Sequence, residues 1–228
     1  FTFLFIFLFI SKLKSEKYGK GSYFSQRITK PNLYKDIPRY YQRFGLPRKL
    51  FQAWLIEQKS IDFVLIESGM TYWYLGIEEV IEDIRNIHPK AKIVLGSIYA
   101  TLCYEHAKEL GVDLVIKGKE LKPLSSFLGI PLNIQAIPLW EKYSKLKTAA
   151  IKITDGCPYS CTYCASKILS PKFAMLNLER KLDELRLLIS LGVKDIAFYD
   201  DALLYAAQDI LVPFLNEVLK RKYKVNFH

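Results

Sequence analysis

The chain has 228 residues, of which 50% are hydrophobic and 14% aromatic, so it is long enough for one large domain or two modest ones, each with a real core. A mean hydropathy of +0.07 and this aromatic content exclude a mainly disordered chain. Four cysteines in a chain of this length exclude a small disulfide scaffold and indicate a reducing compartment. We therefore expect a cytoplasmic protein.

The formal net charge of +10 comes almost wholly from the first quarter of the chain. Residues 1–60 hold 12 Lys or Arg against 3 Asp or Glu, whereas the remaining residues hold 21 against 20. The basic stretch at 12–50 lacks a continuous stripe of charge, so it fits a solvated or membrane-facing arm as well as an RNA-binding footprint. We expect neither a nucleic acid nor a membrane as a partner.

Both ends of the chain are abrupt. Residues 1–10 are apolar, but they fall well short of the roughly 20 residues of a membrane-spanning helix. Basic residues follow this run instead of preceding it, which is the reverse of a signal peptide. We interpret the run as an artefact or as the tail of a longer apolar segment. Residues 225–228 resemble a strand that has just begun, so we expect truncation at both ends.

Strand and helix periodicities alternate after the basic stretch at 12–50, where glycines and prolines predict loops and short helices. A short helix is predicted over 50–59. Three strands and three helices then follow in alternation, with strands over 61–66, 92–95 and 112–116 and helices over 76–87, 99–110 and 119–128. This alternation predicts a parallel, doubly wound sheet and hence an α/β domain over 61–128.

A second α/β unit follows the first. Residues 129–148 contain Pro131 and Pro138 and show no clear period, so we interpret them as a linker. The second alternation covers residues 149–228, with strands over 149–154 and 194–199 and helices over 178–191 and 209–220. The sequence thus predicts two α/β domains in series after an N-terminal segment of 60 residues.

The most informative site is a cysteine loop directly after a predicted strand. Cys157, Cys161 and Cys164 have the spacing Cys-x3-Cys-x2-Cys, which lets one loop wrap a single metal centre. Thiolates at such spacing hold iron–sulfur clusters, and three protein ligands leave one iron of a cubane cluster open. Zinc is the alternative, although structural zinc sites more often use two Cys-x2-Cys pairs. Cys103 lies far off, on a predicted helix.

The cysteine loop, with Tyr163 before its last cysteine, resembles the motif of the radical S-adenosylmethionine (radical SAM) superfamily. The resemblance implies that the three cysteines hold a 4Fe–4S cluster whose open iron binds the amino and carboxylate groups of S-adenosylmethionine (SAM). It implies reductive cleavage of SAM to a 5′-deoxyadenosyl radical, and a reductant such as ferredoxin or flavodoxin. It also implies that residues 149–228 are the N-terminal half of a (β/α) radical SAM barrel.

Two carboxylates, Asp200 and Asp201, follow the second strand of this unit. Members of the family carry a polar motif there that meets the SAM amino group. The common Gly-Gly-Glu form is absent, and the Asp-Asp form resembles the branch with an N-terminal cobalamin-binding domain. Tyr163, Asp200 and Asp201 are therefore candidate SAM contacts, since a carboxylate pairs well with an ammonium group. Alternatively, the two aspartates cap a helix or face solvent.

Residues 61–128 look like the Rossmann-like cobalamin-binding domain of that branch. Four residues at the carboxyl ends of its strands, where open α/β sheets bind ligands at a reversal of strand order, are candidate cobalamin contacts: Ser68, Thr71, Gly96 and Ser97. The Asp-x-His-x-x-Gly signature of a cobalt-ligating histidine is absent. His88 and His106 fit surface or packing positions instead, which leaves the binding of cobalamin open.

The leading hypothesis is a radical SAM enzyme that carries out cobalamin-dependent methyl transfer or another radical modification. Its substrate and its catalytic residues are not assigned by the sequence. One alternative is a methylthiotransferase-like tRNA modifier, which would need further cysteines for a second cluster where only Cys103 is present. The other is a non-catalytic protein that binds an iron–sulfur cluster or zinc.

Overall fold

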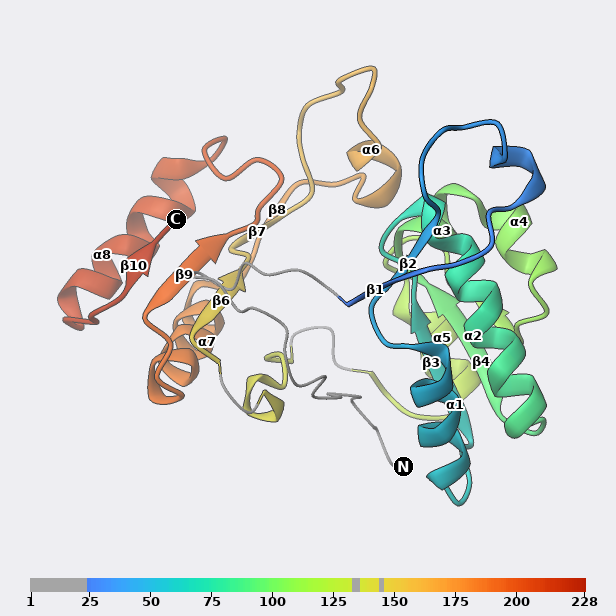
Figure 1. The fold of residues 1–228 in the computed structure, drawn as a ribbon. Coiled ribbons are helices and arrows are strands. Elements are labelled where there is room, and N and C mark those ends of the chain that lie inside the picture. The colour runs from blue at the N-terminus through green and yellow to red at the C-terminus, as the bar shows by residue number, and fades with distance from the viewer. Residues whose placement is uncertain (1–23, 133–135, 144–145) are drawn as a thin grey trace. The chain divides into compact units, whose positions relative to one another are not determined.

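The computed structural model describes residues 24–132, 136–143 and 146–228, so the apolar run at 1–10 lies outside the described residues. The chain divides into two compact units, Phe1–Ser60 and Ile61–His228. The second unit contains two separate three-stranded sheets, each with a helical layer (Figure 1). The expected boundary between two α/β domains at 129–148 stays a prediction.

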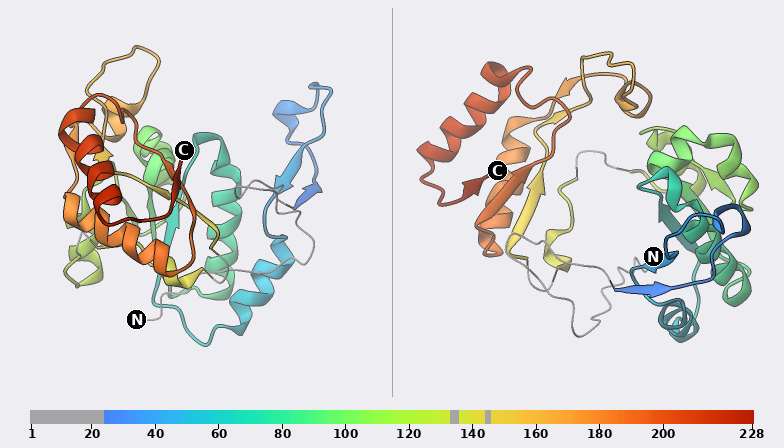
Figure 2. Two further views of the ribbon diagram at one scale, coloured as in Figure 1. Left: turned by 90° about the vertical axis from the view of Figure 1, so that its left-hand side faces the viewer. Right: turned by 45° about the horizontal axis from the view of Figure 1, so that its top comes forward.

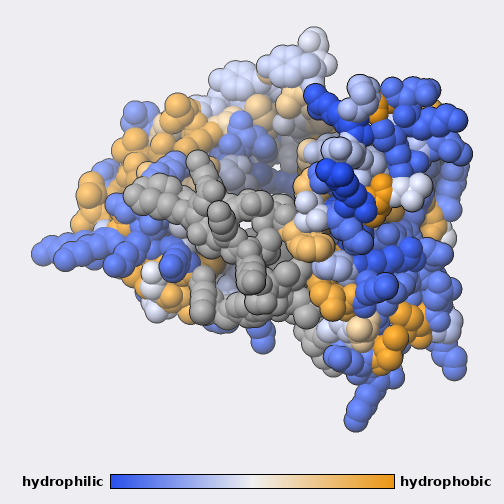
Figure 3. All heavy atoms as spheres, viewed as in Figure 1, coloured by the Kyte–Doolittle hydropathy of each residue, from blue (hydrophilic) through white to orange (hydrophobic). Residues whose placement is uncertain are grey.

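The surface mixes polar and apolar residues. Hydrophilic and hydrophobic side chains are interspersed over the face shown in Figure 3. Large apolar side chains such as Leu33, Tyr40 and Tyr163 are among the exposed ones. Within the described parts of the chain, no helix combines the length and apolar character needed to cross a membrane.

The first unit contains a small antiparallel hairpin that the sequence did not predict. Strands β1 (Ser25–Arg27) and β2 (Gln42–Phe44) pair, and a 3-10 turn, η2 (Asn32–Tyr34), lies between them. Each strand has only three residues, and none of these residues is buried. The sequence therefore shows no alternation of buried and exposed positions that would predict the two strands. Helix α1 (Arg48–Glu57) begins and ends two residues before the predicted helix.

The first sheet of the second unit is parallel. Its strands, in spatial order, are β3 (Phe63–Glu67), β4 (Lys92–Gly96) and β5 (Leu114–Val115). These described strands follow chain order, so they contain no reversal of strand order, in contrast to the predicted doubly wound sheet. A ligand site at such a reversal has no counterpart among them.

Five helical segments accompany this sheet, namely η3 (Thr71–Trp73), α2 (Tyr74–Ile87), α3 (Ser97–Leu102), α4 (Tyr104–Glu109) and α5 (Leu121–Leu128). Helix α2 buries Ile77, Ile81 and Ile84 at helical spacing, as the periodicity predicted. The single helix predicted over 99–110 is broken at Cys103, whose backbone has φ −118° and ψ 46°. Apolar spacing continues across this break, so the periodicity did not reveal it.

Asp113 ties β5 to the neighbouring elements of this sheet. Its carboxylate accepts hydrogen bonds from Arg85 Nη2 at 2.7 Å, from the Ile93 amide at 2.8 Å and from Lys92 Nζ at 2.9 Å. Partial burial raises the pKa of Asp113, but these donors outweigh it and hold the pKa well below its usual range. The ionised carboxylate therefore stabilises the fold above the unfolded-state pKa of about 3.9.

We expect Asp113→Asn to lower the free energy of unfolding by about 1–2 kcal/mol at pH 7. Because the folded-state pKa is depressed, the stabilising effect is lost as pH falls below about 4 toward that lower pKa. The difference in free energy of unfolding between wild type and variant, measured by urea unfolding, should therefore shrink between about pH 5 and about pH 2. A difference that stays constant over this range would contradict the ionic role.

The second sheet is also parallel and carries its helices on one side (Figure 2). Its spatial order is β10 (Asn226–Phe227), β9 (Asp195–Phe198) and β6 (Thr148–Ile151). The helical elements of this half are η4 (Trp140–Lys142), α7 (Leu178–Ser190), a π-helical turn η5 (Ala207–Leu211) and α8 (Val212–Lys220). The strands and helices predicted over 149–228 are therefore present, with altered ends.

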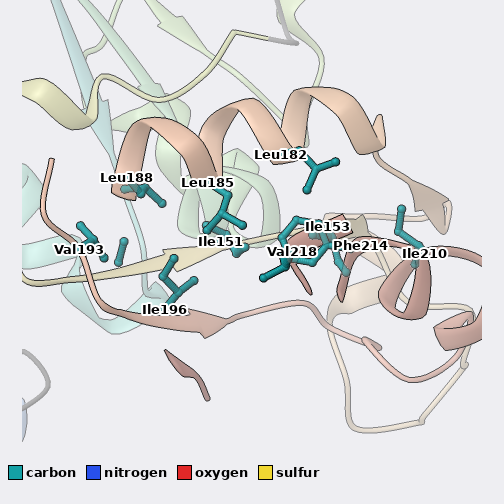
Figure 4. Close-up of a cluster of buried hydrophobic side chains, with 11 residues drawn as sticks. Ile151, Ile153, Leu182, Leu185, Leu188, Val193, Ile196, Ile210, Phe214 and Val218 are labelled. Carbon is teal, nitrogen blue, oxygen red and sulfur yellow. The ribbon is translucent and has the colours of Figure 1, made fainter. Parts of the chain in front are cut away.

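The core of this half lies between the sheet and its helices. Leu182, Leu185 and Leu188 of α7 are fully buried and point toward the strands (Figure 4). Ile151 and Ile196 face them from β6 and β9. Since side chains alternate along a strand, the residues next to each of these isoleucines in its own strand belong to the opposite face of the sheet.

Candidate functional site

The cysteine loop is closed at its neck by a short antiparallel pair. The predicted strand over 149–154 is divided: β6 ends at Ile151, and the chain then forms β7 (Thr154–Asp155), which pairs with β8 (Ala174–Met175). The loop between β7 and β8 contains the three motif cysteines and a short helix, α6 (Ser166–Leu169). Figure 1 shows this loop extending beyond the β7–β8 pair.

Gly156 is the first residue of the loop and is buried. Its φ of +72° lies in the left-handed region, which favours glycine. A Cβ atom at this position would lie 2.9 Å from the Ser170 carbonyl oxygen and still closer to that of Lys172. The returning end of the loop therefore packs directly on the Gly156 backbone.

The three motif cysteines are free thiols on this loop. Cys157 is half-buried, whereas Cys161 and Cys164 are exposed. The Cys164 amide donates to the Cys161 carbonyl oxygen at 3.1 Å, which closes a tight turn between the last two cysteines. Hydrogen bonds from Ser166, whose hydroxyl lies 3.1 Å from Cys164 Sγ, lower the pKa of the Cys164 thiol below its usual value. Metal binding needs the deprotonated thiolate, so this environment suits a ligand.

The structure does not gather the three thiols around one point. Among the described residues, no group of three His, Cys, Asp or Glu side chains is placed to hold a single metal ion. In a 4Fe–4S cluster each thiolate binds a different iron, so three unpaired thiols spread along one exposed loop fit a cluster by their chemistry.

Asp200 and Asp201 follow β9 and contact the strand that leads into the loop. Asp200 Oδ1 accepts hydrogen bonds from the Ile153 amide at 3.0 Å, from the Thr154 amide and from Thr154 Oγ1 at 2.6 Å. Asp201 Oδ2 pairs with Lys152 Nζ at 3.3 Å. The structure thus brings both predicted aspartates to the neck of the cysteine loop.

Lys152 is a site residue that the sequence analysis missed. Its ammonium group bridges Asp201 and Asp155, whose Oδ1 lies 3.2 Å away. Desolvation lowers its pKa, but the two carboxylates outweigh this effect and raise it. The signal was available, because Lys152 lies between buried Ile151 and Ile153 and therefore belongs to the other face of the strand.

The face of the sheet opposite the helices is lined by small residues below this charged group. Ala150 of β6 lies directly opposite Ala197 of β9 in the strand register, and Ala150 is exposed. Tyr199 follows on the same face, 5.8 Å from Lys152 Nζ to its ring centroid. Small side chains beside a Lys–Asp group leave space for a ligand at the carboxyl ends of the strands.

Aromatic residues of the loop and of the segment after β9 lie together. Tyr205 contacts Tyr159 at a centroid distance of 5.7 Å and Phe173 at 5.1 Å, both edge to face. Tyr163, the predicted SAM contact, is 90% exposed. Its ring is therefore free to contact a ligand that binds at the loop.

The candidate cobalamin residues lie at the ends of β3 and β4. Ser68 is buried; its hydroxyl donates to the Gly96 carbonyl and accepts from the Ala100 amide at 3.2 Å. These bonds give the Ser68 side chain a structural role. Ser97 has φ +76° and lies 3.4 Å from Glu67, hydroxyl to carboxylate, whereas Thr71 begins η3.

Two other residues singled out by the sequence have packing partners. His106 Nδ1 lies 2.7 Å from the hydroxyl of buried Tyr99, and its ring also contacts Tyr74 edge to face. Burial raises the pKa of Tyr99 to about 12. Cys103 is half-buried between α3 and α4. These positions agree with packing roles for His106 and Cys103.

Comparison with known proteins finds relatives among methylthiotransferases. No protein-family model matches the chain. It is 29% identical over 181 residues to the threonylcarbamoyladenosine tRNA methylthiotransferase MtaB of Thermotoga maritima, covering 68% of this chain and 42% of that protein. It is 31% identical over 150 residues to the ribosomal protein uS12 methylthiotransferase RimO of Carboxydothermus hydrogenoformans, covering 58% and 34%. The chain thus spans less than half the length of these relatives.

Solved structures with a similar fold include the radical SAM methyltransferase TsrM from Kitasatospora setae. The form with tryptophan and a SAM analogue bound matches with a TM-score of 0.60 and 16% identity, over 77% of this chain and 43% of that chain. The form with cobalamin and a [4Fe-4S] cluster bound matches with a TM-score of 0.58. The match shows that this chain shares the α/β fold of TsrM, as the sequence predicted.

Proposed function

We propose that this chain belongs to the radical SAM superfamily and forms the cluster-binding and SAM-binding part of a radical SAM enzyme. Cys157, Cys161 and Cys164 would each ligate one iron of a 4Fe–4S cluster. When bound, the cluster supplies an open iron for SAM and the electron for its reductive cleavage. The observation that carries this proposal is the three-thiol loop, closed at its neck and placed beside two carboxylates at the carboxyl end of a parallel sheet.

The residues of this chain would bind and orient SAM. Asp200 Oδ2 is buried and has no hydrogen-bond partner among the described residues, so it is free to accept from the SAM ammonium group. Asp201 is partly exposed beside it, and Tyr163 offers an exposed ring on the loop. A cytoplasmic reductant of the ferredoxin or flavodoxin type would supply the electron.

The reaction proposed is the transfer of a methyl-bearing group. The relatives MtaB and RimO are named as methylthiotransferases, and TsrM is named as a methyltransferase. Cobalamin-dependent methyl transfer is the first candidate, since the fold matches a protein solved with cobalamin bound. Ser97, Thr71 and the Gly96 backbone at the ends of β3 and β4 remain the candidate cobalamin contacts.

Methylthio transfer is the second candidate, and the sequence relatives favour it. In that case the substrate would be a tRNA or a ribosomal protein, in contrast to the expectation that no nucleic acid is bound. The two candidates differ in cofactor, so corrinoid absorbance after gel filtration separates them.

The experiment that tests the cluster is anaerobic reconstitution with iron and sulfide. We expect about four irons per chain, as a cubane cluster requires, and loss of this iron in the triple Cys→Ala variant at 157, 161 and 164. Cys103→Ala is the matched control and should load normally. Equal iron uptake by the triple variant would overturn the proposal. SAM added to the dithionite-reduced protein should yield 5′-deoxyadenosine, and a loaded protein that never does so would favour an electron-transfer role.

A further inference from the structure

Asp200 holds the start of the cysteine loop with one oxygen atom. Three donors converge on Oδ1: the Ile153 amide at 3.0 Å, the Thr154 amide and the Thr154 hydroxyl at 2.6 Å. Thr154 has no exposed surface, and Ile153 has none either. Buried amides need an acceptor, so the Asp200 carboxylate is part of the local backbone structure.

The Asp200 carboxylate accepts hydrogen bonds from the chain just beyond the end of the pairing between β6 and β9. The ladder between β6 and β9 closes with the bond from the Tyr199 amide to the Ile151 carbonyl oxygen at 3.1 Å. Beyond Ile151 the chain turns toward β8, where the Leu176 amide donates to the Ile153 carbonyl oxygen at 2.9 Å. The Ile153 and Thr154 amides donate instead to the side chain of Asp200, just beyond the end of β9.

Asp201 adds a second link to the same segment. Its Oδ2 lies 3.3 Å from Lys152 Nζ, which in turn lies 3.2 Å from Asp155 Oδ1. Asp155 also pairs with Lys119. The consecutive aspartates after β9 thus contact residues 152–154, and Lys152 links Asp201 to Asp155, which directly precedes Gly156. Of the two links, the one through Asp200 carries three hydrogen bonds and joins two residues that have no exposed surface.

We propose that Asp200 is a positioning residue that fixes the neck of the cysteine loop through Oδ1, and that this fixed neck sets the placement of the cluster ligands. The proposal rests on the proposed cluster function of the loop. It assigns the two oxygens of one carboxylate to separate tasks, with Oδ1 on the backbone of residues 153 and 154 and Oδ2 left for a ligand. Residues that orient metal ligands typically affect metal affinity about 10- to 100-fold.

The substitutions Asp200→Asn and Asp200→Ala separate the two oxygens. Asparagine keeps an acceptor at Oδ1 and removes the charge at Oδ2, whereas alanine removes both. We expect D200A to retain about tenfold less iron after anaerobic reconstitution and gel filtration. D200N should retain wild-type iron and the wild-type electron paramagnetic resonance spectrum of the reduced cluster, while its affinity for SAM falls. T154V, which removes one of the three donors, should give an intermediate loss of iron.

Asp183→Ala is the control, because Asp183 is a partly exposed carboxylate of α7 that pairs with Arg186. It should leave iron content and spectrum unchanged. Wild-type iron retention and spectrum in D200A would overturn the proposal. A D200N variant as deficient in iron as D200A would also overturn it, because the charge and not the Oδ1 acceptor would then be required.

A second readout on the iron-free protein keeps this inference distinct from the cluster assignment. Lys167 and Lys172 are exposed within the loop, so trypsin cleavage at these sites reports how firmly the neck is held. We expect faster cleavage there in iron-free D200A than in wild type, and wild-type rates in D200N. If wild type takes up no iron but the cleavage pattern holds, the cluster assignment fails and the positioning role stands. Equal cleavage of D200A and wild type would reject the positioning role.

Discussion

Gly156→Ala should lower cluster loading at least about tenfold while most of the fold survives. The added Cβ would lie 2.9 Å from the Ser170 carbonyl oxygen and closer still to that of Lys172, and both contacts are with backbone atoms that cannot rotate away. The φ of +72° adds a conformational cost of about 1–2 kcal/mol for any residue with a Cβ. The neck can accept alanine only if the β7–β8 pair opens, and this would displace Cys157, the next residue.

Gly192→Ala is a matched control for this substitution. Gly192 has φ +87°, so alanine there carries a similar conformational cost, but no atom lies within 4 Å of its Cβ position. We expect G192A to load iron like wild type with a modest loss of stability, and G156A to load at least about tenfold less. Iron content after anaerobic reconstitution measures the difference. Equal loading by the two variants would mean that the neck contact does not matter to the cluster ligands.

The sequence predicted those features that follow from periodicity and spacing. Alternating strands and helices place β3, β4, β6 and β9 within a few residues of their observed bounds, because buried isoleucines and leucines repeat with the period of each element. The cysteine spacing alone identified the loop. Both depend on residues close together in the sequence, so local patterns are sufficient to find them.

The neck of the loop could not be predicted in the same way. The pairing of β7 with β8 joins segments of two residues each, and so short a strand has no detectable alternation. The bonds from Asp200 to residues 153 and 154 span more than 40 positions and depend on how β6 and β9 end. The pairing of Lys152 with Asp201 likewise depends on how these two strands end. Contacts between distant segments therefore decide what the predicted site residues do.

Phe214→Ala tests how much the packing of helix α8 on the β10-β9-β6 sheet stabilises the fold. Phe214 of α8 is fully buried and contacts Phe198 of β9 and Phe227 of β10, each with a centroid distance of 6.0 Å. Removing a buried aromatic ring lowers the free energy of unfolding by about 3–5 kcal/mol. We expect this loss in urea unfolding. Leu219→Ala on the same helix, where Leu219 is 74% exposed, should cost less than about 1 kcal/mol.

Comparison of F214A with G156A should separate the stability of the fold from the assembly of the cysteine loop. Phe214 packs on the helix side of the sheet, whereas Lys152 belongs to the face on the other side. We therefore expect F214A to load iron normally at low temperature, where it remains folded, despite its large loss of stability. G156A should show the reverse pattern, with little iron although most of its fold survives. Loss of iron in folded F214A would mean that placement of the cysteine loop depends on the packing beneath β9 as well as on the bonds at its end.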